Sequence, residues 1–190
     1  DSDLFNRFSL NGYKFIQPWD ALVYHFTSRG SRFNKHSGGA AGKNSDEWLQ
    51  TTTKNGRNFI RKWGDVVKHD LLMKPIISPK YNIGLIVKNC NDPLLHALEP
   101  WADTLYVDEG NIPTLIKKYI EKEQSNTIID LNGRVKPYDN EKQNEILVEI
   151  DGKTFNEEDW YVLMQLPLII KDNGSIGKFQ LNNIKVEIIQ

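Results

Sequence analysis

Residues 83–107 read IGLIVKNCNDPLLHALEPWADTLYV. Two short apolar runs in this stretch, Ile83–Val87 and Thr104–Val107, are rich in the residue types that favour strands. Between them the pattern predicts a helix from about Pro93 to Trp101. Short strands that alternate with helices are typical of a parallel sheet, so the stretch predicts a small parallel α/β layer.

The same alternation continues toward the C-terminus. The pattern predicts a helix over Ile112–Glu123, a strand over Thr127–Leu131, a strand over Glu145–Ile150, a turn at Asp151 and Gly152, a helix from about Asn156 to Met164, and strands near Gly177–Leu181 and Ile184–Ile189. The pair Asn182 and Asn183 is placed to turn the last two strands into a hairpin. Residues 81–190 are therefore expected to form a small α/β accessory module.

The chain before residue 81 has a different pattern. It predicts a helix that ends at Gly12 and carries on one face Leu4, Phe5, Phe8 and Leu10. Two strands are predicted next, over Tyr13–Ile16 and Ala21–Phe26, interrupted at Gln17 and Pro18. A second helix is predicted from Glu47 to about Trp63, with Ser45 or Asp46 as its cap and Gly64 at its end. The Gly- and Ser-rich residues between are expected to form a long loop. The two prolines in Lys74–Lys80 mark this segment as a linker.

The amino-acid composition limits the classes of protein to which this chain can belong. The chain has 190 residues, 39% hydrophobic and 26% charged, which is typical of a globular protein. No run approaches the roughly 20 apolar residues of a transmembrane helix. A single cysteine, Cys90, excludes an internal disulfide and favours a reducing, cytoplasmic compartment. Its neighbours favour a buried thiol over a nucleophile.

Charge is unevenly distributed along the chain. Residues 1–80 hold 13 Lys and Arg against 7 Asp and Glu, a net charge of +6, and residues 81–190 hold 11 against 18, a net charge of −7. A modestly basic segment suits an anionic ligand such as a phosphate. Neither half has the basic density of a nucleic-acid binder, so no nucleic-acid partner is expected.

Five side chains in the first 32 residues could carry chemistry. Asp1 and Asp3 lie at a helix start, His25 lies at a strand end, and Arg29 and Arg32 lie in the following loop. A carboxylate at a helix N-terminus can act as a general base, and a histidine beside it can complete a Mn²⁺ or Mg²⁺ site. The planar guanidinium groups suit a diphosphate. The alternative interpretation is a helix cap, a hydrogen-bonded histidine and two solvated arginines.

The stretch DSDLFNRFSLNGYKFIQPWDALVYHFTSRGSRF, residues 1–33, resembles the distal part of the catalytic domain of inverting, family-two nucleotide-sugar glycosyltransferases of the GT-A fold. The resemblance extends to FIRKWG, residues 59–64. It implies that residues 1–75 belong to a GT-A-like mixed sheet with helices. It also implies a nucleotide-sugar donor and an acceptor with a free hydroxyl.

The resemblance implies a role for each candidate residue. Asp1 matches the aspartate that deprotonates the acceptor hydroxyl, and His25 matches a histidine that binds the divalent cation, Mn²⁺ or Mg²⁺, in several relatives. Arg29 and Arg32 fall where a loop contacts the donor diphosphate, and Asp3 matches an acidic position of less constant role. The reaction would be one displacement with inversion at the anomeric carbon.

Two family features are missing from this sequence. No glutamate precedes Asp1, and the nucleotide-binding half with its Asp-x-Asp motif is absent. The sequence therefore predicts a fragment that is inactive alone and that associates as a homo-oligomer through an open sheet edge. The alternative is a non-catalytic α/β interaction or assembly protein with glycosyltransferase ancestry.

Overall fold

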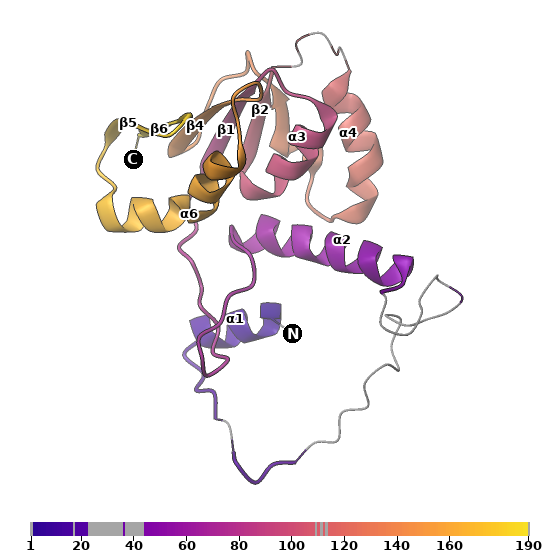
Figure 1. Ribbon diagram of the computed structural model, residues 1–190, viewed down its shortest axis with the longest axis vertical. Coiled ribbons are helices and arrows are strands. Elements are labelled where there is room, and N and C mark those ends of the chain that lie inside the picture. The colour runs from indigo at the N-terminus through magenta and orange to yellow at the C-terminus, as the bar shows by residue number, and fades with distance from the viewer. Residues whose placement is uncertain are drawn as a thin grey trace. The chain divides into compact units, whose positions relative to one another are not determined.

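The computed structural model describes residues 2–16, 18–22, 36, 44–108, 110, 112 and 114–189. The chain divides into two compact units, drawn in Figure 1. The first comprises Asp1–Phe59 with Val67–Ile77, and the second comprises Ile60–Val66 with Ser78–Gln190. Among the described residues, no helix is long and apolar enough to cross a bilayer.

The second unit contains a six-stranded mixed sheet in the order β3-β2-β1-β4-β6-β5. The strands are β1 (Ile83–Lys88), β2 (Thr104–Val107), β3 (Val135–Pro137), β4 (Ile146–Asp151), β5 (Gly177–Leu181) and β6 (Ile184–Ile188). The first four in chain order run parallel, and β6 and β5 form an antiparallel end. The α/β class predicted from the sequence is confirmed.

Helices of this unit cover one face of the sheet (Figure 1). They are α3 (Asp92–Leu98), which continues into the 3-10 turn Glu99–Trp101, α4 (Leu115–Glu123), the short α5 (Leu131–Arg134) and α6 (Glu157–Asn173). Alternate strand residues such as Leu85 and Val148 are fully buried, and they share one core cluster with Leu95 of α3 and Leu166 of α6. Burial of alternate residues marks a sheet that packs on helices through one face.

The first unit contains α1 (Ser2–Leu10) and most of α2 (Asp46–Trp63). Both helices were predicted, and both end at the glycines expected to stop them, since Gly12 and Gly64 each have a φ of 75°. The hydroxyl of Ser45 caps α2 by accepting a hydrogen bond of 3.2 Å from the backbone N–H of Trp48.

Three sequence predictions are wrong. Residues 13–16 form no strand, and α6 continues past Met164 to Asn173, through Pro167. Leu166 and Ile170 of this longer helix are buried in the core, which offsets the cost of a proline inside a helix.

The predicted strand Thr127–Leu131 is the third error. The side-chain amide of Gln124 donates to the carbonyls of Thr127 and Ile129 and accepts from the N–H of Leu131. These backbone groups therefore have hydrogen-bond partners without pairing to a neighbouring strand. Ile128 is fully exposed. The third parallel strand is instead β3, which pairs with β2.

A fully buried carboxylate joins the terminal hairpin to α6. Asp159 accepts hydrogen bonds from the backbone N–H of Asn156 at 3.0 Å, and from the backbone N–H and side-chain amide of Asn183 at 3.1 and 3.0 Å. Asn156 in turn accepts from the N–H of Asp159, which completes a capping box. The turn between β5 and β6 is thereby held against the start of α6.

Replacing Asp159 by alanine is expected to lower the free energy of unfolding by about 2–3 kcal/mol, because the capping box loses its reciprocal half and three part-buried donor groups of Asn156 and Asn183 lose their acceptor. Urea unfolding followed by circular dichroism measures the change. Glu158→Ala is the matched control, because Glu158 is an exposed carboxylate in the same helical turn. A loss in Asp159→Ala no larger than in this control would contradict the assignment.

Candidate functional site

Four of the five residues predicted to form a site, Asp1, His25, Arg29 and Arg32, lie outside the described residues. The fifth, Asp3, lies in the first turn of α1, where its carboxylate is 3.1 Å from the guanidinium Nε of Arg7. This pair is one helical turn apart and partly exposed, a geometry that contributes about 0.3–0.5 kcal/mol. The convergence of Asp3 with the other four residues stays a prediction, because those four lie outside the described part of the chain.

The surroundings of Asp3 are apolar and exposed. Leu4, Phe5 and Phe8 on α1 are 39–44% exposed, and Leu10 is 63% exposed. Phe5 packs edge-to-face on Phe15 and Phe8 packs edge-to-face on Tyr13 of the following segment, with ring centroids 5.7 and 5.3 Å apart. Among the described residues of Asp1–Phe59 and Val67–Ile77, no apolar side chain is buried. The first unit thus has no hydrophobic core of its own in its described part.

The carboxyl ends of β1 and β4 form the point where the strand order reverses, which is where open parallel sheets usually bind ligands. Here the two loops contact each other directly. The side chain of Asn89 donates to Asp151 at 2.8 Å, and the N–H of Gly152 donates to the carbonyl of Lys88 at 2.9 Å. A Cβ on Gly152 would come within 2.6 Å of the carbonyl oxygen of Asn89. These contacts narrow the crevice between the two loops.

The electrostatics of this end also disfavour a phosphate. Hydrogen bonds from the backbone of Lys153 and from Asn89 lower the pKa of Asp151, which keeps it ionised. The N-terminus of α3 is occupied by its own cap, since the side chain of Asn91 accepts from the N–H of Leu94 at 2.9 Å. An anion there would meet Asp92 and Asp151 rather than free N–H groups.

Cys90 is buried beside this loop, as the sequence predicted. Burial raises the pKa of its thiol to about 12. The thiolate is the reactive form of cysteine, so this side chain is chemically inert at neutral pH.

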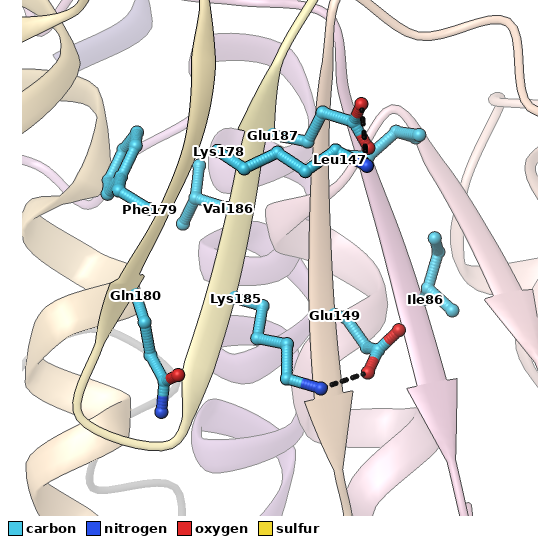
Figure 2. A pocket seen from close by; sticks show the side chains of 9 residues that line it. All are labelled: Ile86, Leu147, Glu149, Lys178, Phe179, Gln180, Lys185, Val186 and Glu187. Atoms are coloured by element: carbon cyan, nitrogen blue, oxygen red, sulfur yellow. Dashed lines mark hydrogen bonds and ion pairs between the residues drawn. The ribbon is translucent and has the colours of Figure 1, made fainter.

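The uncovered face of the sheet holds a shallow concavity of about 390 Å³. Figure 2 shows its lining, in which charged side chains of β4, β5 and β6 surround Ile86 and Leu147. At Gly84 of β1 and Tyr106 of β2 the same face is covered, because Asn144 accepts a 2.9 Å hydrogen bond from the hydroxyl of Tyr106 and lies against Gly84. The open part thus runs from Ile86 of β1 across β4 to β6 and β5.

Charges within this concavity neutralise one another. Glu149 lies 3.0 Å from the ammonium of Lys88 and 3.1 Å from that of Lys185, and Lys178 lies 3.2 Å from Glu187. Burial alone would raise the pKa of Glu149, but the hydrogen bonds from the two lysines outweigh it and lower the pKa. A surface of paired charges around two apolar side chains suits a macromolecular contact better than the binding of one small ion.

This face was not predicted from the sequence. The alternation of buried and accessible residues in β4 and β6, with Glu149, Lys185 and Glu187 on the accessible side, is the signal that could have found it. The ion pairs of Glu149 with Lys88 of β1 and Lys185 of β6 could not be predicted, because they depend on which strands lie next to β4.

The described residues contain no group of three His, Cys, Asp or Glu side chains that could hold a metal ion. Comparison with known proteins adds no homologue: no family model, no curated protein and no solved structure matches this chain.

Proposed function

We propose that residues 1–64 are the distal part of the catalytic domain of an inverting nucleotide-sugar glycosyltransferase, and that residues 81–190 are an α/β accessory module attached to it. The support for this proposal is the resemblance carried by residues 1–33 and 59–64. Two local features support it, since α1 stops at Gly12 and α2 stops at Gly64 as in the matched segments, whereas residues 13–16 form no strand where the family has one.

The observation that carries the proposal is the exposed apolar surface of the first unit. Leu10, Ile16, Trp19 and Leu22 are 63–97% exposed, and no apolar residue in the described part of this unit is buried. Leaving so much apolar surface in water is unfavourable, by about 25 cal/mol per Å². These residues are accounted for if they pack against the donor-binding half of a catalytic domain, to which the resemblance does not extend.

In the proposed reaction, the Asp1 carboxylate accepts the proton of the acceptor hydroxyl while that oxygen attacks the anomeric carbon of the donor. The bond from this carbon to the diphosphate oxygen breaks, and the nucleotide diphosphate leaves with the electron pair. Arg29 and Arg32 would stabilise the charge that accumulates on the leaving group. His25 would help to hold a divalent cation, whose chemistry is to neutralise the same diphosphate.

Isolated residues 1–190 are expected to bind a uridine-diphosphate sugar very weakly or not at all, because the proposal places most donor contacts in the other half of the domain. Isothermal titration calorimetry with Mn²⁺ present measures this. Sub-micromolar binding by the chain alone would contradict it.

The proposal itself is tested by a transferase assay on a protein that joins these residues to a donor-binding half. Release of uridine diphosphate from a donor sugar in the presence of a hydroxyl acceptor, abolished by Asp1→Asn, is the expected result. Release that is unchanged in Asp1→Asn would overturn it.

A second function, a non-catalytic interaction module, is favoured by one observation in the α/β unit. The uncovered face of its sheet holds a concavity in which charged side chains pair with one another beside Ile86 and Leu147. Such a surface suits contact with another macromolecule. The two functions are compatible, since an accessory module of a transferase can itself be an interaction module.

A further inference from the structure

The two edges of the six-stranded sheet differ in how well they are protected. One edge is β3, which has three residues and includes Pro137, a residue that cannot donate a ladder hydrogen bond. The other edge is β5, which has five residues and no proline. The segment that enters β5 does not cover it, since residues 174–178 are all exposed and Ile176 is 75% exposed. Only β5 is therefore an open edge in the described part of the sheet.

The register of the hairpin fixes which backbone groups of β5 face outward. Leu181 pairs with Ile184 across a two-residue turn, so Leu181, Phe179 and Gly177 exchange hydrogen bonds with β6. Because bonding alternates along an antiparallel strand, the N–H and C=O groups of Lys178 and Gln180 point away from β6. The next outward carbonyl, that of Asn182, already accepts a 2.8 Å bond from the side chain of Gln180.

We infer that β5 pairs in antiparallel fashion with β5 of a second copy of this chain, about a two-fold axis at Phe179. In this register Lys178 lies opposite Gln180 of the second copy. The outward N–H and C=O groups of Lys178 then exchange hydrogen bonds with those of Gln180 of the second copy. The two-fold axis repeats this bonded pair on its other side. Phe179 lies opposite its own copy at a position without hydrogen bonds, where Cα atoms approach to about 4.5 Å.

Side-chain chemistry favours this register over its neighbour. Shifting the pairing by two residues to put Lys178 opposite its own copy would juxtapose like charges. In the register inferred here the lysine instead faces a neutral glutamine, and its ammonium is already paired with Glu187 of the same chain at 3.2 Å, as Figure 2 shows. The one charge on the edge, which would normally discourage pairing, is thus compensated within the chain.

The contact would also extend both faces of the sheet into the second copy. Phe179 packs against the core on the helix-covered face, so its copy would extend that apolar layer across the axis. On the other face the two concavities would lie on one continuous twelve-stranded surface. Two strands of five residues bury less than about 1,200 Å², so the dissociation constant is expected to be on the order of 10⁻⁴ M.

The test combines sedimentation with amide hydrogen exchange on the full chain. Raising the concentration from about 10 μM to 1 mM should convert monomer to dimer and slow exchange at Lys178 and Gln180, whose N–H groups are free in the monomer. The amides of Phe179 and Leu181, bonded to β6 in either state, should change little. This alternating pattern is specific to edge pairing and would not arise from contact through another surface.

Lys178→Pro should weaken dimerisation by at least about tenfold, because proline removes an outward N–H while sparing the bonds to β6. Lys178→Thr is the matched control, since it also removes the charge but keeps the N–H, and it should change the dissociation constant by less than about threefold. Gln180→Pro repeats the test at the second outward N–H if Lys178→Pro lowers the melting temperature. A monomer at the highest concentration, or a dimer that neither proline variant weakens, would overturn the inference.

Discussion

Replacing Glu99 by glutamine is expected to lower the free energy of unfolding of the α/β unit by about 3–5 kcal/mol, the largest effect on stability that the structure predicts. Glu99 is fully buried. Its carboxylate accepts hydrogen bonds of 2.6–3.1 Å from Nε and Nη2 of Arg61 and one of 2.9 Å from the hydroxyl of Tyr119. Arg61 also donates to Glu123 at 2.7 Å.

Arg134 completes this cluster. Its Nε lies 2.7 Å from the Glu99 carboxylate but outside hydrogen-bond geometry, so the contact is ionic, while its Nη2 donates to the carbonyls of Glu99 and Pro100. Burial lowers the pKa of Arg134, and Glu99 opposes that shift. For Arg61, burial also opposes the charged form, but hydrogen bonds to Glu99 and Glu123 outweigh it and raise the pKa. Both cations therefore depend on the same carboxylate.

With glutamine at position 99, Arg134 would lose its ion pair with the Glu99 carboxylate while Arg61 would keep Glu123, and an uncompensated buried charge is what makes such a change costly. Total stability of a domain is only about 5–15 kcal/mol, so the variant would unfold at much lower urea concentration. Glu121→Gln is the matched control, because Glu121 is 64% exposed on α4 and its nearest lysine nitrogen is 3.9 Å away. A loss below about 1 kcal/mol in Glu99→Gln would show that the cluster does not stabilise the fold.

This cluster also shows where sequence reasoning reaches its limit. Arg61 lies on the strongly polar helix α2, and its sequence neighbours give no sign that it is fully buried among acids 38 and 62 residues away. Hydrophobic periodicity shows which face of a helix is apolar. Whether a charged side chain is buried depends instead on its ion-pair partners, and the partners of Arg61 are distant in sequence. The pairing depends on the tertiary fold and is not encoded in any local pattern.

Elements with a strong local signal were predictable. The strand Thr104–Val107 and the hairpin at Asn182 follow from β-favouring runs and turn residues, and Asn182 indeed takes a left-handed φ of 51°. The segment Thr127–Leu131 has an equally β-favouring composition, yet the side chain of Gln124 satisfies its backbone instead. Strand propensity depends on an available partner strand, and here that place is taken by Val135–Pro137.

The structure tests the predicted fold but leaves the predicted site untested. Asp3 is paired with Arg7 as a surface residue, and the other four predicted residues lie outside the described part of the chain, so their convergence stays a prediction. The roles assigned to them come from the resemblance and from the chemistry of the residue types. The strongest test of these assigned roles is therefore a measurement of transferase activity.

Asp1→Asn is expected to lower kcat of the transferase that contains these residues by about 10²- to 10⁴-fold, the range that general-base catalysis usually contributes. Asparagine has nearly the shape of aspartate but cannot accept the proton that the acceptor hydroxyl loses as it attacks. Donor binding does not involve this proton, so the dissociation constant of the donor should stay within about threefold of the wild-type value. Turnover measured at saturating donor and acceptor, beside calorimetry of donor binding, separates the two quantities.

The pH dependence distinguishes a base from a residue that only shapes the acceptor site. If Asp1 accepts the proton, wild-type kcat must fall on the acid side as its carboxylate becomes protonated, and that limb must be missing from the residual activity of Asp1→Asn. A purely structural aspartate would give a variant with lower kcat but the same acid limb. Asp46→Asn is the matched control, because Asp46 is an exposed carboxylate in the first turn of α2, and its removal should leave kcat and the pH profile unchanged. Full turnover in Asp1→Asn would remove the base from the mechanism, whereas weakened donor binding with unchanged kcat would move Asp1 from catalysis to donor recognition.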